Sequence, residues 1–167
     1  MSSFSPVNSL VIPQAIADTS TTQLLPLGTR VRAVDTASTA YGEGEFIYLK
    51  GVASTAVGSA VVFNSDDGST TLASANAIGP VAFAMSANVA SQYGWYQVYG
   101  KAVGKVLASF ADNANCYLTS TAGSIDDAVV AGDYISNCKG ASAIDTPSTG
   151  LAELEISYPF VRDGLDV

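Results

Sequence analysis

Residues 78–106, IGPVAFAMSANVASQYGWYQVYGKAVGKV, decide the fold of this chain. The stretch holds the single Trp and the densest run of residues that favour β-structure. The apolar run 81–85, which follows Gly79 and Pro80, predicts one strand, and the aromatic run that begins at Trp95 predicts a second. The small polar residues 86–94 suit a connecting loop. We therefore expect a central hairpin with which the other segments pair.

The second strand of this hairpin carries aromatic side chains on both of its faces. With a period of two, the residues of one face are Trp95, Gln97, Tyr99 and Lys101, and those of the other are Tyr96, Val98, Gly100 and Ala102. Neither face is therefore expected to be fully exposed to water. Gly100 predicts an interruption of the strand.

The composition favours sheets over helices and excludes two classes of partner. Charged residues make up only 13% of the 167 residues, about half the usual share. Long surface helices, which depend on Glu and Lys, are not expected. The formal charge is −8, and the seven basic residues form no run. We therefore expect neither nucleic acid nor an anionic membrane as a partner.

The chain lacks the residues that most metal and acid–base sites need. It contains no His and only two cysteines, Cys116 and Cys138, without a CxxC spacing. We expect no metal or other cofactor. Two buried thiols are the simpler interpretation of the cysteines, and one disulfide is the alternative. The first 14 residues lack the basic and apolar parts of a signal peptide, and no apolar run approaches a membrane span.

Two regions are expected along the chain. Residues 1–23 are rich in Ser and Thr and are interrupted by Pro6 and Pro13, which predicts an extended or disordered N-terminal arm. Apolar residues within the arm, Val7 and Leu10 among them, favour ordering against a partner. Residues 24–167 are expected to form the folded domain.

The start of this domain places two guanidinium groups on one face of a strand. After Gly28, Arg30 and Arg32 alternate with Val31 and Ala33. Charge pairing with a neighbouring chain is the functional interpretation, and an edge strand protected by charge is the structural one. The following GEGE sequence, 42–45, is expected to be a turn whose carboxylates face solvent or the arginines.

The remaining segments complete an all-β pattern. Residues 46–49 predict a strand with bulky side chains on both faces, and 57–64 and 70–72 predict a hairpin around an Asp-Gly turn. Residues 151–158 alternate cleanly and predict a closing strand with one face in water, ended by Pro159. We expect a single all-β domain, a β-barrel or β-sandwich of about eight short antiparallel strands with an extended N-terminal arm.

No pattern in the sequence predicts catalysis. Glu43 and Glu45, or Asp126 and Asp127, invite an acid–base interpretation, but solvated turns explain both pairs better. The run DDG at 66–68 lacks the spacing of a calcium loop. The nucleophile and phosphate motifs of known enzymes are missing, so we expect that the protein is not an enzyme.

Several stretches carry a resemblance to a known family. They are LPLGTRVRA (25–33), YGEGEFIYLKGVAS (41–54), VGSAVVFN (57–64), GPVAFAMSA (79–87), YGWYQVYGKAV (93–103), YLTSTAGSIDDAVVAGD (117–133) and LAELEISYPFVRDG (151–164). Together they resemble the capsid decoration, or cement, proteins of tailed bacteriophages. The resemblance implies a β-rich virion protein on the outer capsid surface, where it binds the major capsid protein and neighbouring copies of itself as a trimer or dimer.

The expected function is therefore structural: the protein reinforces contacts between major capsid subunits. The residues expected to form the capsid or subunit contact are Leu24, Leu27, Arg30, Arg32, Phe46 and Tyr48. The alternative is a carbohydrate-binding or adhesion module displayed on a particle or cell surface. In that case Trp95, Tyr96 and Tyr99 would stack on sugar rings, although core packing also explains such a run.

Overall fold

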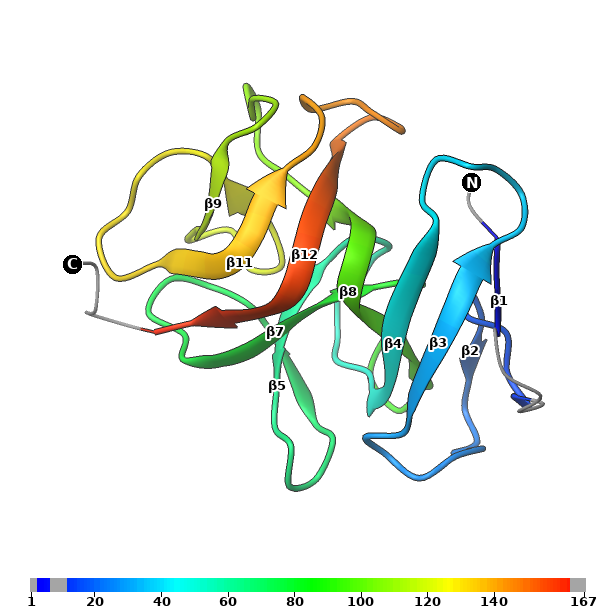
Figure 1. Cartoon of the computed structure of the whole chain (residues 1–167). Coiled ribbons are helices and arrows are strands. Elements are labelled where there is room, and N and C mark those ends of the chain that lie inside the picture. Colours follow the sequence, from blue (N-terminus) through cyan, green and yellow to red (C-terminus); the bar gives the residue numbers. More distant parts are fainter. Residues whose placement is uncertain (1–2, 7–11, 163–167) are drawn as a thin grey trace.

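The structure is a computed structural model that describes residues 3–6 and 12–162, and this part of the chain is all-β with no helix (Figure 1). The expected all-β class is thus confirmed. The strands are β1 (Phe4–Pro6), β2 (Thr19–Ser20), β3 (Arg30–Asp35), β4 (Glu43–Lys50), β5 (Ala60–Phe63), β6 (Thr70–Leu72), β7 (Gly79–Ala84), β8 (Tyr93–Lys105), β9 (Asn115–Leu118), β10 (Ile125–Asp126), β11 (Tyr134–Gly140) and β12 (Leu151–Val161).

The strands form one branched antiparallel sheet that does not close into a barrel. Its main path runs β1-β3-β4-β8-β7-β12-β11-β9-β10. β2 joins β8, the β5–β6 hairpin joins β7, and β12 also pairs with β8. The sequence predicts a β-barrel or β-sandwich of about eight strands; the described residues instead form twelve strands in one sheet that is not closed into a barrel, so only the all-β class is confirmed. The additional strands, such as β2 and β10, are only two residues long, too short to show a period of two in the sequence.

The predicted central hairpin is confirmed as β7 and β8. Phe83 pairs with Gln97 and Ala84 with Tyr96, and the first half of β8 lies between β7 and β4. Trp95 and Tyr96 are both fully buried although they point to opposite faces. Both faces of this half of β8 are thus covered, as the aromatic pattern predicts.

A β-bulge divides β8 and changes which side chains share a face. Glu45 of β4 pairs with Tyr99, but the next residue, Phe46, pairs with Gln97, so β8 has one extra residue here. The bulge moves Tyr99 to the face opposite Gln97. The expectation that these two residues share a face is wrong, because it assumed unbroken alternation. Beyond the bulge, β8 pairs with β12.

Gly100 and Gln97 allow this bulge to form. Gly100 has φ +100°, and a Cβ there would lie 2.6 Å from the carbonyl oxygen of Glu43. The buried Gln97 amide donates hydrogen bonds to the carbonyl oxygens of Tyr99 and Lys101, each at 3.0 Å. A side chain thus ties together the backbone on the far side of the bulge.

The described part of the N-terminal region packs against the chain's own core. β1 pairs with β3, and β2 pairs with β8. Trp95 Nε1 donates to the Gln14 carbonyl oxygen at 3.1 Å, and the Tyr48 hydroxyl donates to Gln14 Oε1 at 2.9 Å. Ile16 is 2% exposed. Residues 12–23 thus lie against the sheet, whereas the sequence predicts an extended or disordered arm over residues 1–23; Val7 and Leu10 lie outside the described residues.

The closing strand β12 follows its predicted alternation up to Ser157. Ala152, Leu154 and Ile156 are buried in the largest hydrophobic cluster, and Glu155 is exposed. At Tyr158 the backbone turns to φ +50°, and the side chain becomes exposed instead of joining the inner row. Pro159 does not end the strand, which continues to Val161.

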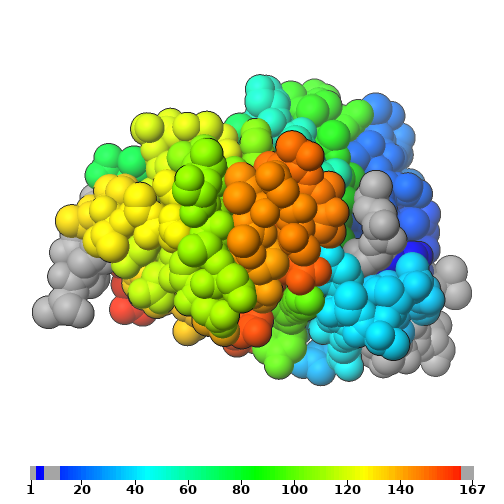
Figure 2. Space-filling view, turned by 90° about the horizontal axis from the view of Figure 1, so that it is seen from above, coloured from blue at the N-terminus to red at the C-terminus, as the bar shows by residue number. Residues whose placement is uncertain are grey.

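The largest cluster fills the space between β7, β9, β11 and β12. It includes Cys116 and Cys138, which are buried free thiols. Hydrogen bonding to Cys116, together with burial, raises the pKa of the Cys138 thiol. One end of this cluster is covered by the loop 141–150, orange in Figure 2, which lies beside the yellow-green segment around Phe110; Ile144 N donates to the Phe110 carbonyl oxygen at 3.0 Å.

The bulge yields a first prediction. Gly100→Ala should lower the free energy of unfolding by about 3 kcal/mol, because it combines an unfavourable φ with a close approach to the Glu43 carbonyl. Gly150→Ala is the matched control, since Gly150 has φ +75° and no atom within 4 Å of an added Cβ; it should cost about 1 kcal/mol. Urea unfolding followed by Trp95 fluorescence measures both, and equal losses would exclude a role for the close approach.

A second prediction concerns Gln14. Gln14→Ala leaves the buried Tyr48 hydroxyl without its acceptor and should cost about 2 kcal/mol. The control is Gln23→Ala, which alters an exposed side chain and should change stability by less than about 0.5 kcal/mol. If both variants unfold at the same urea concentration as the wild type, the N-terminal segment does not contribute to the core in solution.

Candidate functional site

Charged and tyrosine side chains gather on the outer face of β3, β4, β8 and β12, which lie side by side in Figure 1. We call this region the tyrosine–arginine surface. Its members are Arg30, Arg32, Tyr41, Glu43, Glu45, Tyr99, Lys101, Glu153 and Tyr158.

Strand alternation and register bring the first of these residues together. In β3 the exposed Arg30 and Arg32 alternate with the buried Val31 and Ala33. Arg32 pairs with Glu45 of β4, and Glu45 pairs with Tyr99 of β8. A row of side chains thus crosses three strands, and the β8 bulge is what places Tyr99 at its end.

Ion pairs link the arginines to the carboxylates of the neighbouring strand. Arg30 lies 3.1 Å from Glu45 Oε1, and Arg32 lies 3.2 Å from Glu43 Oε1 and 3.7 Å from Glu45 Oε2. The arginine side chains are about half exposed, whereas that of Glu45 is 13% exposed. Exposed pairs of this kind add at most about 1 kcal/mol each, so their main effect is to hold the side chains in position.

Tyr99 and Tyr158 form an exposed aromatic pair at the centre of the surface. Their ring centroids are 5.5 Å apart with an interplanar angle of 35°, and the residues are 39% and 45% exposed. The Tyr158 hydroxyl donates to Glu45 Oε2 at 2.8 Å, and this hydrogen bond raises the pKa of the phenol. The guanidinium of Arg30 lies 6.0 Å from the Tyr158 ring centre, and that of Arg32 lies 6.0 Å from the Tyr99 ring centre.

A second group extends the surface along β8 and β12. Lys101 Nζ lies 2.7 Å from Glu153 Oε2 and 5.4 Å from the ring centre of Tyr41. Burial and the nearby Glu153 carboxylate raise the pKa of Tyr41 to about 12. Tyr41 is therefore neutral at physiological pH.

The six residues expected to form a contact surface do not lie together. Arg30 and Arg32 belong to the tyrosine–arginine surface. Phe46 and Tyr48 are fully buried on the opposite face of β4, in contact with the cluster that contains Trp95. They are therefore not accessible to another subunit, because the N-terminal segment covers that face. Leu24 and Leu27 lie at the edge of that face: Leu24 is 43% exposed, and Leu27 is partly buried against the cluster.

The candidate acid–base residues have structural partners. Glu43 and Glu45 belong to β4, not to a turn, and both face the arginines. Asp126 accepts a hydrogen bond from the backbone N–H of Asp127, and burial raises the pKa of the Asp126 carboxyl. The carboxylate of Asp67 accepts hydrogen bonds from Ser69, as expected for the β5–β6 turn.

The aromatic run proposed for sugar stacking is mostly inaccessible. Trp95 and Tyr96 have no exposed surface. Of the three rings, only that of Tyr99 reaches solvent. A glycan cannot stack on this run as the sequence suggested.

Residues 3–6 and 12–162 contain no group of three or more His, Cys, Asp or Glu side chains suited to a metal ion. No helix in these residues is long and apolar enough to cross a membrane. No family model matches the chain, and searches of curated proteins and of solved structures found no match either.

Sequence reasoning identifies the arginines of this surface but misses its tyrosine pair. The alternation of Arg30 and Arg32 with apolar residues is a clear signal for an outward row. Tyr158 occupies an inward position in the pattern of β12, and nothing local to the sequence indicates its left-handed backbone. Gly100 signals an irregularity in β8, but does not specify which side chains change face.

The raised pKa of Tyr41 gives a third prediction. The folded state favours the neutral phenol, so this contribution to stability is complete below about pH 10, the ordinary pKa of tyrosine, and is lost as the pH rises towards 12. The absorbance of the tyrosinate band is titrated for the wild type and for Tyr41→Phe. The difference between the two curves should show one group that titrates near pH 12. Near-ultraviolet circular dichroism monitors folding during the titration.

Glu153→Gln should lower this midpoint, because it removes the carboxylate beside the phenol. Titration in concentrated urea supplies the unfolded reference. A midpoint near pH 10 in the folded wild type would contradict the environment described for Tyr41.

Proposed function

We propose that this protein is a structural virion protein of a tailed bacteriophage, which binds the outer surface of the capsid and reinforces contacts between major capsid subunits. Its partners are the major capsid protein and neighbouring copies of itself, in dimers or trimers. The resemblance of seven stretches between residues 25 and 164 supports this class. The tyrosine–arginine surface supports a role in protein contact.

The observation that carries the proposal is the conformation of Tyr158. A bulky residue at φ +50° is strained, typically by about 1–3 kcal/mol, and such strain concentrates at functional positions. Here it presents an exposed ring beside Tyr99, in a place where the alternation of β12 would bury it. A solvated sheet face gains nothing from this arrangement, whereas a contact surface gains an exposed aromatic ring.

The surface has the composition and rigidity of an interface centre. Tyrosine and arginine are enriched among the residues that dominate binding energy. Both kinds of side chain are held here by ion pairs, ring contacts and the hydrogen bond between Tyr158 and Glu45. Because they are ordered before binding, less conformational entropy is lost when a partner docks.

The charge distribution also favours association through this face. Its three cations, Arg30, Arg32 and Lys101, balance three carboxylates, so the formal charge of −8 resides on the rest of the chain. Repulsion between acidic copies is therefore weakest when this face is apposed. Many copies on one shell need only modest individual affinity.

A fourth prediction tests this function on capsids. Empty shells assembled from the major capsid protein of the same phage should bind the wild-type protein in a co-sedimentation assay. Tyr99→Ala and Arg32→Ala should each weaken binding about tenfold, equivalent to about 1.4 kcal/mol. Tyr134→Ala is the matched control, because Tyr134 is 37% exposed but lies outside the surface; it should bind like the wild type. Full occupancy by both surface variants, or no binding by the wild type, would refute the proposal.

The expected contribution of the N-terminal arm needs a different test from truncation. Removing the residues before Thr22 would delete Gln14 and Ile16, which are buried, and so would disturb the fold. Leu24→Ala changes an exposed side chain beside that segment and is the better variant. Unchanged capsid occupancy would exclude Leu24 from the contact.

A further inference from the structure

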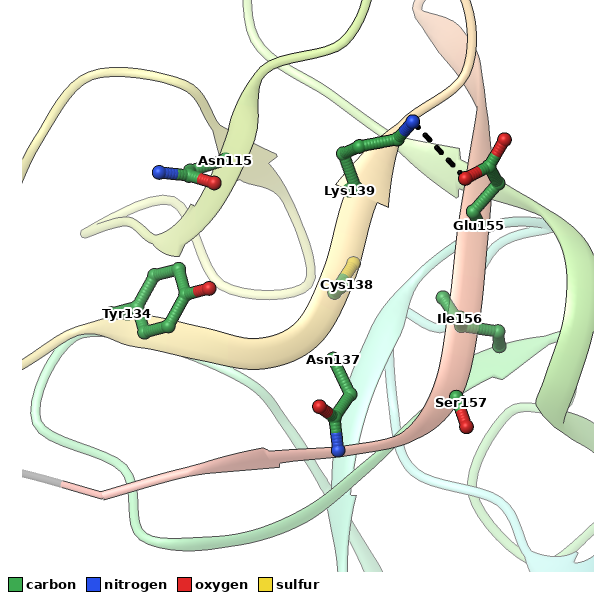
Figure 3. A pocket seen from close by; sticks show the side chains of 8 residues that line it. All are labelled: Asn115, Tyr134, Asn137, Cys138, Lys139, Glu155, Ile156 and Ser157. Atoms are coloured by element: carbon green, nitrogen blue, oxygen red, sulfur yellow. Dashed lines mark ion pairs between the residues drawn. The ribbon is translucent and has the colours of Figure 1, made fainter.

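An open depression of about 410 Å³ lies at β9, β11 and β12 (Figure 3). Figure 3 shows polar side chains arranged around β11, with one contributed by β9 and two by β12. These polar residues are Asn115, Tyr134, Asn137, Lys139, Glu155 and Ser157. The depression shares no residue with the tyrosine–arginine surface.

An irregularity in β11 opens this depression. The pairing with β9 passes from Tyr134–Tyr117 directly to Lys139–Asn115, which leaves four intervening residues of β11 opposite one of β9. Within this segment Asn137 has φ +59°, and the pairing with β12 also shifts between Ser136 and Cys138. Bulges of this kind redirect side chains, and Asn tolerates the left-handed conformation better than most residues.

The lining offers hydrogen-bonding groups that the fold does not use. Within residues 3–6 and 12–162, the side chains of Asn115, Tyr134, Asn137 and Ser157 have no hydrogen-bond partner. Amides and hydroxyls both donate and accept. A ligand that carries several hydroxyl groups matches such a set, since each hydroxyl also donates and accepts.

The charged pair in the lining argues for a neutral ligand. Lys139 Nζ lies 3.1 Å from Glu155 Oε2 and donates to Asn113 Oδ1 at 3.2 Å. The two charges cancel, so neither an anion nor a cation is favoured without breaking this pair. The remaining lone pairs of Glu155 and the remaining N–H group of Lys139 are still available to the hydroxyl groups of a ligand.

An exposed aromatic ring completes the arrangement. Tyr134 is 37% exposed, and its ring centre lies 5.5 Å from that of Tyr117, at an interplanar angle of 55°. Tyr117 is largely buried and supports the Tyr134 ring. The C–H face of a pyranose packs well on such a ring, which combines an apolar body with a polar tip.

We propose that this depression binds one neutral pyranose unit of an oligosaccharide or polysaccharide. The Tyr134 ring packs against the sugar face, while the amides of Asn115 and Asn137 and the Ser157 hydroxyl bond its hydroxyl groups. The volume lies at the lower end of the range of small-molecule sites, which suits a single sugar ring. This role does not depend on capsid binding.

A fifth prediction tests this site by nuclear magnetic resonance. Maltose, cellobiose, lactose and chitobiose are titrated separately into 15N-labelled protein, each up to about 50 mM, because a shallow site of this size implies a dissociation constant on the order of 1 mM. At least one disaccharide should shift the side-chain amide signals of Asn115 and Asn137. Binding to an immobilised polymer of the same sugar then shows whether the protein recognises a polysaccharide in addition to the free disaccharide.

Two variants and one control locate the binding. Asn137→Gly removes the amide but keeps a residue that favours positive φ, so the fold is retained. This variant and Tyr134→Ala should each weaken binding about tenfold. Tyr99→Ala, which alters an exposed tyrosine of the other surface, should bind the sugar like the wild type while losing capsid affinity.

Three results would overturn the proposal. The first is that no disaccharide shifts the two amide signals at any concentration. The second is that Asn137→Gly binds as tightly as the wild type. The third is that 3′-sialyllactose or glucose 6-phosphate binds and the neutral sugars do not, which would show an anion site. Because Tyr134→Ala is also the control for capsid binding, the two proposals can fail separately.

Discussion

The hydrogen bonds from the buried Gln97 amide to the carbonyl oxygens of Tyr99 and Lys101 hold the central strand in its bulged form. The amide has space because Gly44 lies opposite it: a Cβ on Gly44 would approach Gln97 Nε2 to 2.8 Å. Gly100 likewise leaves space for the carbonyl oxygen of Glu43, to which a Cβ on Gly100 would approach to 2.6 Å. Without this arrangement β8 would alternate regularly, and Tyr99 would face the Trp95 side of the sheet. The place of Tyr99 on the tyrosine–arginine surface therefore depends on one buried amide and two glycines.

Irregular backbone positions produce both candidate binding surfaces. The bulge in β8 and the left-handed Tyr158 in β12 bring two tyrosine rings to the arginine row. The left-handed Asn137 in β11 opens the depression beside β9. Regular strands elsewhere bury their apolar rows and supply a rigid support. Each irregular backbone position costs free energy that the surrounding sheet must offset. Such positions cluster at functional sites in proteins.

The two surfaces differ in the interactions that they offer. On the tyrosine–arginine surface, the charged groups are paired and the rings are in mutual contact. A partner protein would therefore displace water from side chains that are already ordered. The depression at β11 instead presents amide and hydroxyl groups that have no hydrogen-bond partner among the described residues, which suits a small hydroxylated ligand. The two surfaces are neighbours, because Ser157 pairs with Tyr99 and Glu155 pairs with Lys101 across β12 and β8. The formal charge of −8 lies outside the tyrosine–arginine surface, on the remainder of the chain.

The sequence by itself determined the all-β class, the β7–β8 hairpin, the outward arginine row and the burial of Trp95 and Tyr96, because each depends on local periodicity or turn chemistry. Only the tertiary structure decided the open sheet, the packing of the N-terminal segment on Trp95 and Tyr48, and the exposure of Tyr99 and Tyr158. The reason is physical: one extra residue in a strand reverses the face of every side chain beyond it, and strand pairing, not local sequence, decides where that residue is accommodated.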